Sequence, residues 1–279
     1  MSKAATLAPA RPWRPTLWLS VGVLVGYAFL ALFGPILTPH DPTEFLTDTP
    51  FAPPRPGIWL GTDYLGRDVL SRLIDGARLT IAMALAATVL SHLIGATLGL
   101  VAAASGGVVD SVLSRIVDLV LALPKIIVGL VVIAALGPSI PVIVVLAGIV
   151  YAAGVFRIAR ALGADLMQFD FIRVARSRGE GLVWILFGEV APHVVRPLAA
   201  DFALRMSFAI LFMSSLSFLG LGVQPPMADW GGLVRENLQG LTAGSWAPVF
   251  PALAIAGASI ALNLLVDNLS EPQNGKARA

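Results

Sequence analysis

The stretch Asp170-Phe-Ile-Arg-Val-Ala-Arg-Ser-Arg-Gly179-Glu-Gly181 is polar, yet hydrophobic runs of membrane length lie on both sides of it. Its basic side chains fall within six residues: Arg173, Arg176 and Arg178. Three of its apolar residues have the helical i, i+3, i+4 spacing: Phe171, Val174 and Ala175. This spacing predicts a short helix with one apolar face, which Gly179 then ends. Such a helix suits docking to a partner outside the membrane, and an ordinary basic cytoplasmic loop is the alternative.

The composition of the whole chain is that of an integral membrane protein. Its 279 residues are 57% hydrophobic and 13% charged, with a mean hydropathy of +0.83, whereas soluble domains carry about 25% charged residues. The formal charge of +2 is too small to indicate nucleic-acid binding. The chain has no cysteine, which excludes disulfides and thiol chemistry, and its histidines are too scattered to predict a metal site.

Six apolar runs predict an all-α membrane protein, because a span needs roughly 20 apolar residues. The predicted spans are 17–37, 80–104, 116–136, 141–155, 198–221 and 248–266. Two of them contain GxxxG pairs, Gly22/Gly26 and Gly95/Gly99, which permit close helix approach.

The predicted organisation follows from these spans. A cytoplasmic tail (1–16) precedes the first transmembrane helix (17–37), an extracytoplasmic segment (38–79) follows, and a tail (271–279) ends the chain. A five-helix core (80–270) contains a cytoplasmic loop (157–194). Lysines and arginines number twelve in the proposed inside segments and five outside, which predicts that both termini are cytoplasmic. The extracytoplasmic segment is Pro-rich and turns helical from Asp68, where Asp68 and Arg72 have the spacing of a surface ion pair.

Polar residues within the predicted spans are candidates for a translocation path. Lys125 lies two turns into the third span, with Asp118 seven residues earlier on the same predicted face; snorkelling of Lys125 to the interface is the alternative. Asp201 and Arg205 are spaced to neutralise each other. Three serines of the fifth span either pack helices together or border a pore: Ser214, Ser215 and Ser217.

The motifs of several enzyme classes are absent from the sequence. It has no P-loop, HExxH or GxSxG, so we expect no ATP hydrolysis and no catalysis by this chain. A secondary transporter would favour inverted repeats and clustered intramembrane charges, and a membrane enzyme would favour acidic groups or histidines at one depth. Neither pattern is found.

Three further motifs resemble one family over about residues 15–270. Leu60-Gly-Thr-Asp-Tyr-Leu-Gly-Arg-Asp68, Ser217-Phe-Leu-Gly-Leu-Gly222 and Asn263-Leu-Leu-Val-Asp267 are similar to signatures of ABC importer permease subunits. Within this family they resemble the branch of dipeptide, oligopeptide and nickel permeases. The resemblance implies a type I importer fold in the bacterial inner membrane.

The opening stretch resembles the E-A-A-x3-G-x9-I-x-L-P motif of this superfamily. Arg173-Val-Ala175, Gly179 and Pro192 stand at the family's spacing, but Arg173 replaces the glutamate and Glu189 the isoleucine. The resemblance implies a coupling helix that docks in a groove of an ATPase subunit. Its candidate coupling residues are Phe171, Arg173, Val174, Ala175, Arg176, Arg178, Gly179, Glu180 and Pro192.

The resemblance also implies an assembly. A second homologous permease, two ATP-binding subunits that carry ATP and Mg²⁺, an extracytoplasmic substrate-binding protein and membrane lipid are the expected partners, with no nucleic acid and no cofactor in this chain. Peptides, nickel chelates and opine-like solutes are the substrate classes that it implies. Five residues outside the spans are candidates for docking or gating: Asp63, Arg67, Asp68, Asp229 and Trp230.

Overall fold

The computed structural model describes residues 15–270, and this part of the chain is almost entirely helical, as predicted. Its only β structure is two isolated bridges in the loop before α2. In chain order the helices are α1 (Pro15–Leu37), α2 (Val69–Ser105), α3 (Gly107–Ala122), α4 (Lys125–Leu136), α5 (Ile140–Leu166), α6 (Asp170–Ser177), α7 (Leu182–Trp184), the π-helix η1 (Ile185–Val190), α8 (Ala191–Phe218), α9 (Trp230–Glu236), the 3₁₀ helix η2 (Leu238–Leu241) and α10 (Val249–Ser270).

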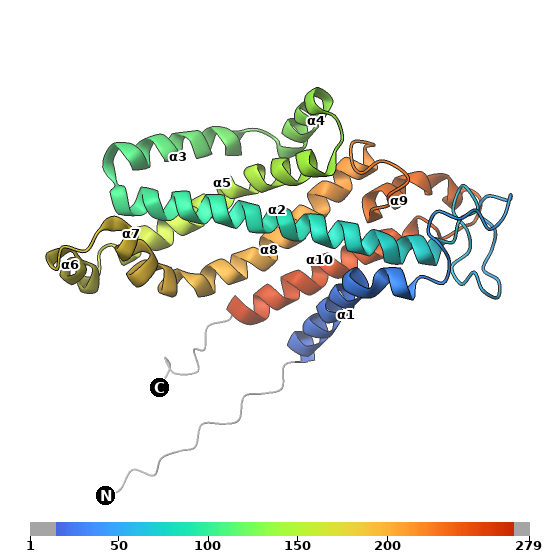
Figure 1. Ribbon diagram of the computed structural model, residues 1–279, viewed down its shortest axis with the longest axis horizontal. Helices are drawn as coiled ribbons and strands as arrows, with labels where there is room; N and C mark the ends of the chain where they lie inside the picture. The colour runs from blue at the N-terminus through green and yellow to red at the C-terminus, as the bar shows by residue number, and fades with distance from the viewer. Residues whose placement is uncertain (1–14, 271–279) are drawn as a thin grey trace, which may run out of the picture.

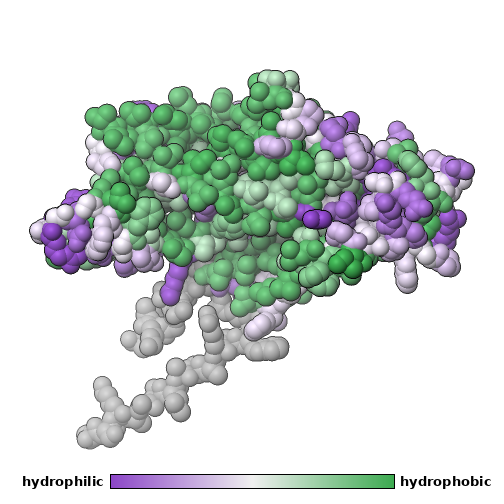
Figure 2. Space-filling view, in the orientation of Figure 1, coloured by the Kyte–Doolittle hydropathy of each residue, from purple (hydrophilic) through white to green (hydrophobic). Residues whose placement is uncertain are grey.

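The long helices run side by side in one body, with α6 at one end and the loop before α2 at the other (Figure 1). Five described helices are long and apolar enough to cross a membrane: α1, α2, α5, α10 and the rod Leu182–Phe218 that contains α8. The bent pair of α3 and α4 is a sixth candidate span. Figure 2 shows hydrophobic residues over the middle and hydrophilic residues at the α6 end and at the loop end. A membrane protein with both ends in water has this distribution.

The tightest helix pair is α2 against α5, and a GxxxG pair makes it possible. A Cβ atom on Gly95 or Gly99 would overlap the carbonyl oxygens of Ala152 or Phe156 on α5. The two backbones therefore touch directly, as the sequence predicted. At the other pair, Gly22 and Gly26, an added Cβ atom would have no atom of the described chain within 4 Å, so these glycines make no such contact here.

The third predicted span is wrong as a single helix. The chain bends by 88° between α3 and α4. Pro124 causes the break, because it has no N–H to donate and it disfavours the helical conformation at Leu123, which is extended. Four other spans extend beyond their predicted bounds at one end: α2 already begins at Val69, α5 continues to Leu166, the rod with α8 already begins at Leu182, and α10 continues to Ser270.

The first turn of α1 lies beside the last part of α10. The side-chain oxygens of Thr16 and Asn268 are 3.4 Å apart. This adjacency agrees with an even number of spans, whereas the cytoplasmic orientation of the two ends stays a prediction. The predicted tails fall outside the described residues, apart from Pro15 and Thr16.

Candidate functional site

The polar stretch between α5 and α8 forms a helix where it was predicted. Asp170 lies in the first turn of α6 and Arg176 in the last, and both charges oppose the partial charge of the helix end beside them. After α6 the N–H of Glu180 donates to the carbonyl of Ala175 across 3.2 Å, and Gly179 has φ +81°. This is a glycine-terminated helix end, so the predicted break at Gly179 is confirmed.

The buried face of α6 coincides only in part with the predicted apolar face. Ile172 and Ala175 are fully buried against residues of η1 and α8, whereas Val174 is 53% exposed. Phe171 is partly buried and its ring stacks on that of His193, with centroids 5.3 Å apart. The stripe that packs on the protein runs through Phe171, Ile172 and Ala175, and Val174 lies about 100° to its side, so the coupling role of Val174 stays a prediction.

The arginines of this segment divide into two groups. The side chains of Arg173 and Arg176 are exposed to solvent. Among residues 15–270 the one ion pair of Arg173 is with Asp170, at 3.3 Å, and the Asp170 side chain is exposed as well. Arg178 instead holds the segment to the next helix, since it lies 3.5 Å from Glu189 and its guanidinium is 5.6 Å from the Trp184 ring centroid. Glu189, where the family motif has isoleucine, therefore has a structural partner in Arg178.

A π-helix, which the sequence did not predict, connects α6 to the membrane rod. It spans Ile185–Val190, and Pro192 follows in the first turn of α8, where a missing N–H is tolerated. Single π-helical turns occur often at functional sites. Glu180 is partly buried beside Arg178, at 3.8 Å.

The prediction that Lys125 and Asp118 share one helix face is wrong. Lys125 begins α4 beyond the bend, and its ammonium lies 4.6 Å from the centroid of the Tyr151 ring. Asp118, still on α3, is 2.7 Å from Arg157 of α5. The two residues share no helix face, because the chain turns between them. The predicted pair of Asp201 and Arg205 is confirmed at 3.2 Å.

The three serines of α8 occupy different environments. Ser214 and Ser217 are buried, while Ser215 is exposed and donates to the carbonyl of Leu211. Ser214 and Ser215 line a cavity of about 500 Å³ between α4, α8, α9 and α10, and Ser214 Oγ has no hydrogen-bond partner in the described chain. Their role in a translocation path stays a prediction.

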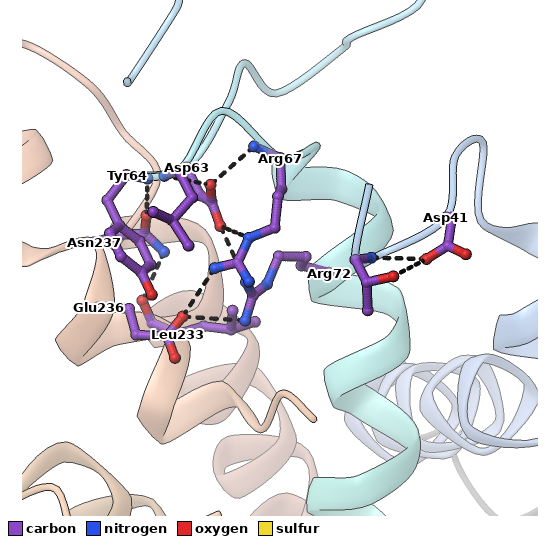
Figure 3. A network of polar contacts seen from close by, with 10 residues as sticks. Asp41, Asp63, Tyr64, Arg67, Arg72, Leu233, Glu236 and Asn237 are labelled. Carbon is purple, nitrogen blue, oxygen red and sulfur yellow. Dashed lines mark hydrogen bonds and ion pairs between the residues drawn. The ribbon is translucent and has the colours of Figure 1, made fainter. Parts of the chain in front are cut away.

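A buried charge network occupies the loop end of the molecule (Figure 3). Asp63 accepts from Arg67 Nε at 2.7 Å and from Arg72 Nη1 at 3.1 Å, and Arg72 Nη2 donates to Glu236 of α9 at 3.0 Å. The main-chain N–H of Tyr64 donates to Asn237 at 3.2 Å. The network therefore ties the loop before α2 to α9.

The predicted surface pair of Asp68 and Arg72 is wrong. Both side chains are buried, and Asp68 instead caps α2 by accepting from the N–H and hydroxyl of Ser71. Their i, i+4 spacing permits a pair, but Arg72 faces the two acids of the network. The sequence also missed Glu236, whose only signal is an acidic residue within the loop between the last two spans.

The five docking or gating candidates are all buried, so in this conformation a partner does not touch their side chains directly. The indole N–H of Trp230 donates to the carbonyl of Leu73, and the main-chain N–H of Trp230 donates to the hydroxyl oxygen of Thr80. Asp229 caps α9 by accepting from the N–H groups of Gly231 and Gly232. Burial raises the pKa of Asp229 to about 6. A gating role for these residues stays a prediction.

Comparison with known proteins gives consistent matches. The family described as "Binding-protein-dependent transport system inner membrane component" matches residues 95–274. The chain is 35% identical over 256 residues to the di/tripeptide transport system permease protein DppC of Pseudomonas aeruginosa, covering 90% of this chain and 84% of the relative. It is 34% identical over 262 residues to the glutathione transport system permease protein GsiD of Pectobacterium atrosepticum, covering 94% and 86%. The dipeptide transport system permease protein DppC of Escherichia coli K12 is 37% identical over 259 residues, covering 90% and 85%.

Proposed function

The chain belongs to the family of binding-protein-dependent transport system inner membrane components, and we propose that within it this permease imports short peptides in an ATP-driven complex. It is an inner membrane protein and a transport component. Its relatives are named for dipeptides, di- and tripeptides and glutathione, which favours peptides over nickel chelates or opines as its substrates. ATP hydrolysis belongs in this proposal to two partner ATPases. A second homologous permease and an extracytoplasmic binding protein complete the complex.

The observation that carries the proposal is the construction of α6. Its inner stripe is buried on the protein, whereas Arg173 and Arg176 point outward at the end of the apolar body. A helix held by its own apolar face, with basic residues exposed, supports contact with an acidic groove of an ATPase. The exposed arginine at position 173, where the family has glutamate, supports a groove more acidic than usual.

The same construction supports a mechanical route from the ATPases to the outer end. Displacement of α6 would be passed to η1 through the packing of Ile172 and Ala175 and through the Arg178–Glu189 pair. The rod from Leu182 to Phe218 is a continuous run of helix and ends beside α9. The buried network then links α9 to the outer loop. We propose that ATP-driven closure moves these elements together and alternates access to the substrate.

Co-purification with the ATPase subunit tests the proposal. Replacing residues 171–181 by a neutral linker is expected to abolish ATPase association. A control variant neutralises three exposed charges at the opposite end and should keep full association: Glu44, Asp48 and Arg55. If the linker variant still bound the ATPase fully, the assignment of α6 as the coupling helix would fail.

A further inference from the structure

The break between α3 and α4 leaves polar main-chain groups without partners inside the apolar body. Pro124 precedes α4 and no side chain caps this helix. The N–H of Val128 reaches the carbonyl of Pro124 at 3.1 Å, whereas no acceptor is found in the described chain for the N–H groups of residues 125–127. Unpaired N–H groups are costly in a membrane, so an acceptor from elsewhere would be stabilised here.

Lys125, at the same place, has no anionic partner among the described residues. Its ammonium faces the ring of Tyr151, whose hydroxyl already donates to the carbonyl of Phe208 at 2.9 Å. The two carboxylates carried by neighbouring segments have other partners. Asp118 pairs with Arg157, and Asp201 lies 3.2 Å from Arg205 and 3.4 Å from His92. The positive charge of Lys125 is therefore uncompensated.

A cavity of about 460 Å³ lies beside this ammonium, bounded by the end of α3, by α4 and by α5. Lys125 is the one charged residue that lines it within the described part of the chain. The rest of its wall is formed by apolar residues such as Val128, Val145 and Ile149. Its volume is in the range of small-ligand sites, about 300–1,000 Å³. One cation in an apolar wall matches a solute with one anionic group and an apolar body.

We propose that this cavity binds the terminal carboxylate of a short peptide, with the Lys125 ammonium as its counter-ion and an apolar peptide side chain against α4 and α5. This inference rests on the proposed function, because it assigns a site to the solute of that importer. The free N–H groups at the start of α4 would donate hydrogen bonds to the same carboxylate. The positive end of the helix favours an anion there.

Binding of radiolabelled alanyl-phenylalanine to the purified importer complex in detergent, without binding protein, tests this site. Unlabelled peptide as the free acid should compete at least about tenfold better than its C-terminal amide, as expected for a charge-assisted contact away from water. Lys125→Met should abolish this difference, and Lys125→Arg should keep most of it. Arg115→Met removes an exposed cation of α3 that lines none of the described cavities and should behave like the wild type.

A second variant tests the cavity independently of the charge. Ile149→Trp fills the cavity from a half-exposed wall position and should weaken binding of acid and amide alike. The proposal would be overturned if Lys125→Met still preferred the free acid over the amide, or if Ile149→Trp bound the peptide with wild-type affinity. Displacement of the peptide by short-chain phosphatidylglycerol that depends on Lys125 would also overturn it, because the site would then belong to lipid.

The failure of this inference can be separated from failure of the proposed function. ATP-driven peptide uptake by the wild-type complex in proteoliposomes, with its binding protein, tests the function alone. Uptake by the wild type together with unaltered acid preference in Lys125→Met refutes only the site. Absence of uptake by the wild type refutes the function itself.

Discussion

Arg72 and Glu236 lie 164 residues apart in the sequence, yet Nη2 of Arg72 donates to Oε2 of Glu236 across 3.0 Å. Arg72 also donates to Asp63, and its side chain is only 1% exposed. One buried cation thus joins the loop before α2, the start of α2 and α9. Buried ion pairs contribute little net stability when intact, but removing one partner leaves an unpaired charge in a medium of low dielectric constant.

Arg72→Met is therefore expected to lower the free energy of unfolding by about 3 kcal/mol, because Asp63 and Glu236 lose one of the two arginines that they share and keep only Arg67. Thermal unfolding followed by tryptophan fluorescence in detergent measures the effect. Arg55→Met, at an exposed position of the same loop, is the matched control and should change little. Equal melting temperatures for the two variants would contradict a structural role of the network.

The raised pKa of Asp229 should make the free energy of unfolding depend on pH. Its folded pKa is about 6 and its ordinary value is 3.8, so the carboxyl is neutral in both states below about pH 4. Between these values the unfolded chain loses the proton first, and the free energy of unfolding falls as pH rises, by on the order of 3 kcal/mol. Above about pH 6 this contribution stays lost.

Melting temperatures from pH 4 to pH 7.5 should therefore fall more steeply in the wild type than in Asp229→Asn, which keeps an acceptor for the α9 cap. Comparing the two proteins removes the contributions of carboxyl groups that both contain. One of these is Glu236, because burial raises its pKa as well. Parallel pH profiles would show that Asp229 is not held neutral by its surroundings.

Because α2 contacts α5 directly, we expect a valine to lower the stability of the protein at Gly95 but not at Gly22. Gly95→Val places methyl groups against the backbone of α5, which should cost about 1–3 kcal/mol or prevent folding. A Cβ atom added at Gly22 has no atom of the described chain within 4 Å, so Gly22→Val should leave the melting temperature of the isolated permease unchanged. A similar loss in both variants would refute the direct α2–α5 contact.

Gly179→Pro is expected to uncouple transport from ATP hydrolysis. Proline cannot adopt the φ of +81° found here, and it removes the N–H that donates to Arg176 at 3.0 Å. Local strain of roughly 3 kcal/mol should reduce peptide uptake on the order of tenfold or more, while ATPase activity persists. Gly181→Pro is the control, because the φ of Gly181 is already −73°. Wild-type uptake by Gly179→Pro would refute the prediction.

Arg176→Glu should weaken the contact of α6 with its ATPase. Arg176 is exposed, and reversing one charge at an interface rim should lower the association constant by roughly five- to tenfold at low salt and by less at high salt. Uptake and co-purification at two salt concentrations measure this. Arg55→Glu, at the other end of the molecule, should show no such effect. A salt-independent loss would indicate misfolding.

Much of the fold could be predicted because its signals are local in sequence. Apolar length located the spans, the glycine pair at Gly95 and Gly99 predicted a close helix contact, and Gly179 marked the end of α6. These features depend on properties that neighbouring residues carry with them: hydrophobic length, side-chain volume and backbone freedom. The buried pair of Asp201 and Arg205 was predictable for the same reason, since both residues lie on one helix.

Partners of charged groups were decided only by the tertiary structure. Arg72 has a carboxylate at helical spacing, Asp68, but it binds Asp63 and Glu236, because burial of the whole loop end leaves those acids facing it. Asp118 lies near Lys125 in the sequence but pairs with Arg157, because the bend at Pro124 turns α4 away from α3. Sequence alone thus determined which segments are apolar enough to cross the membrane and that α6 ends at Gly179. Their packing determined which charges meet, because the electrostatic energy depends on distance in space and on exclusion of water rather than on separation along the chain.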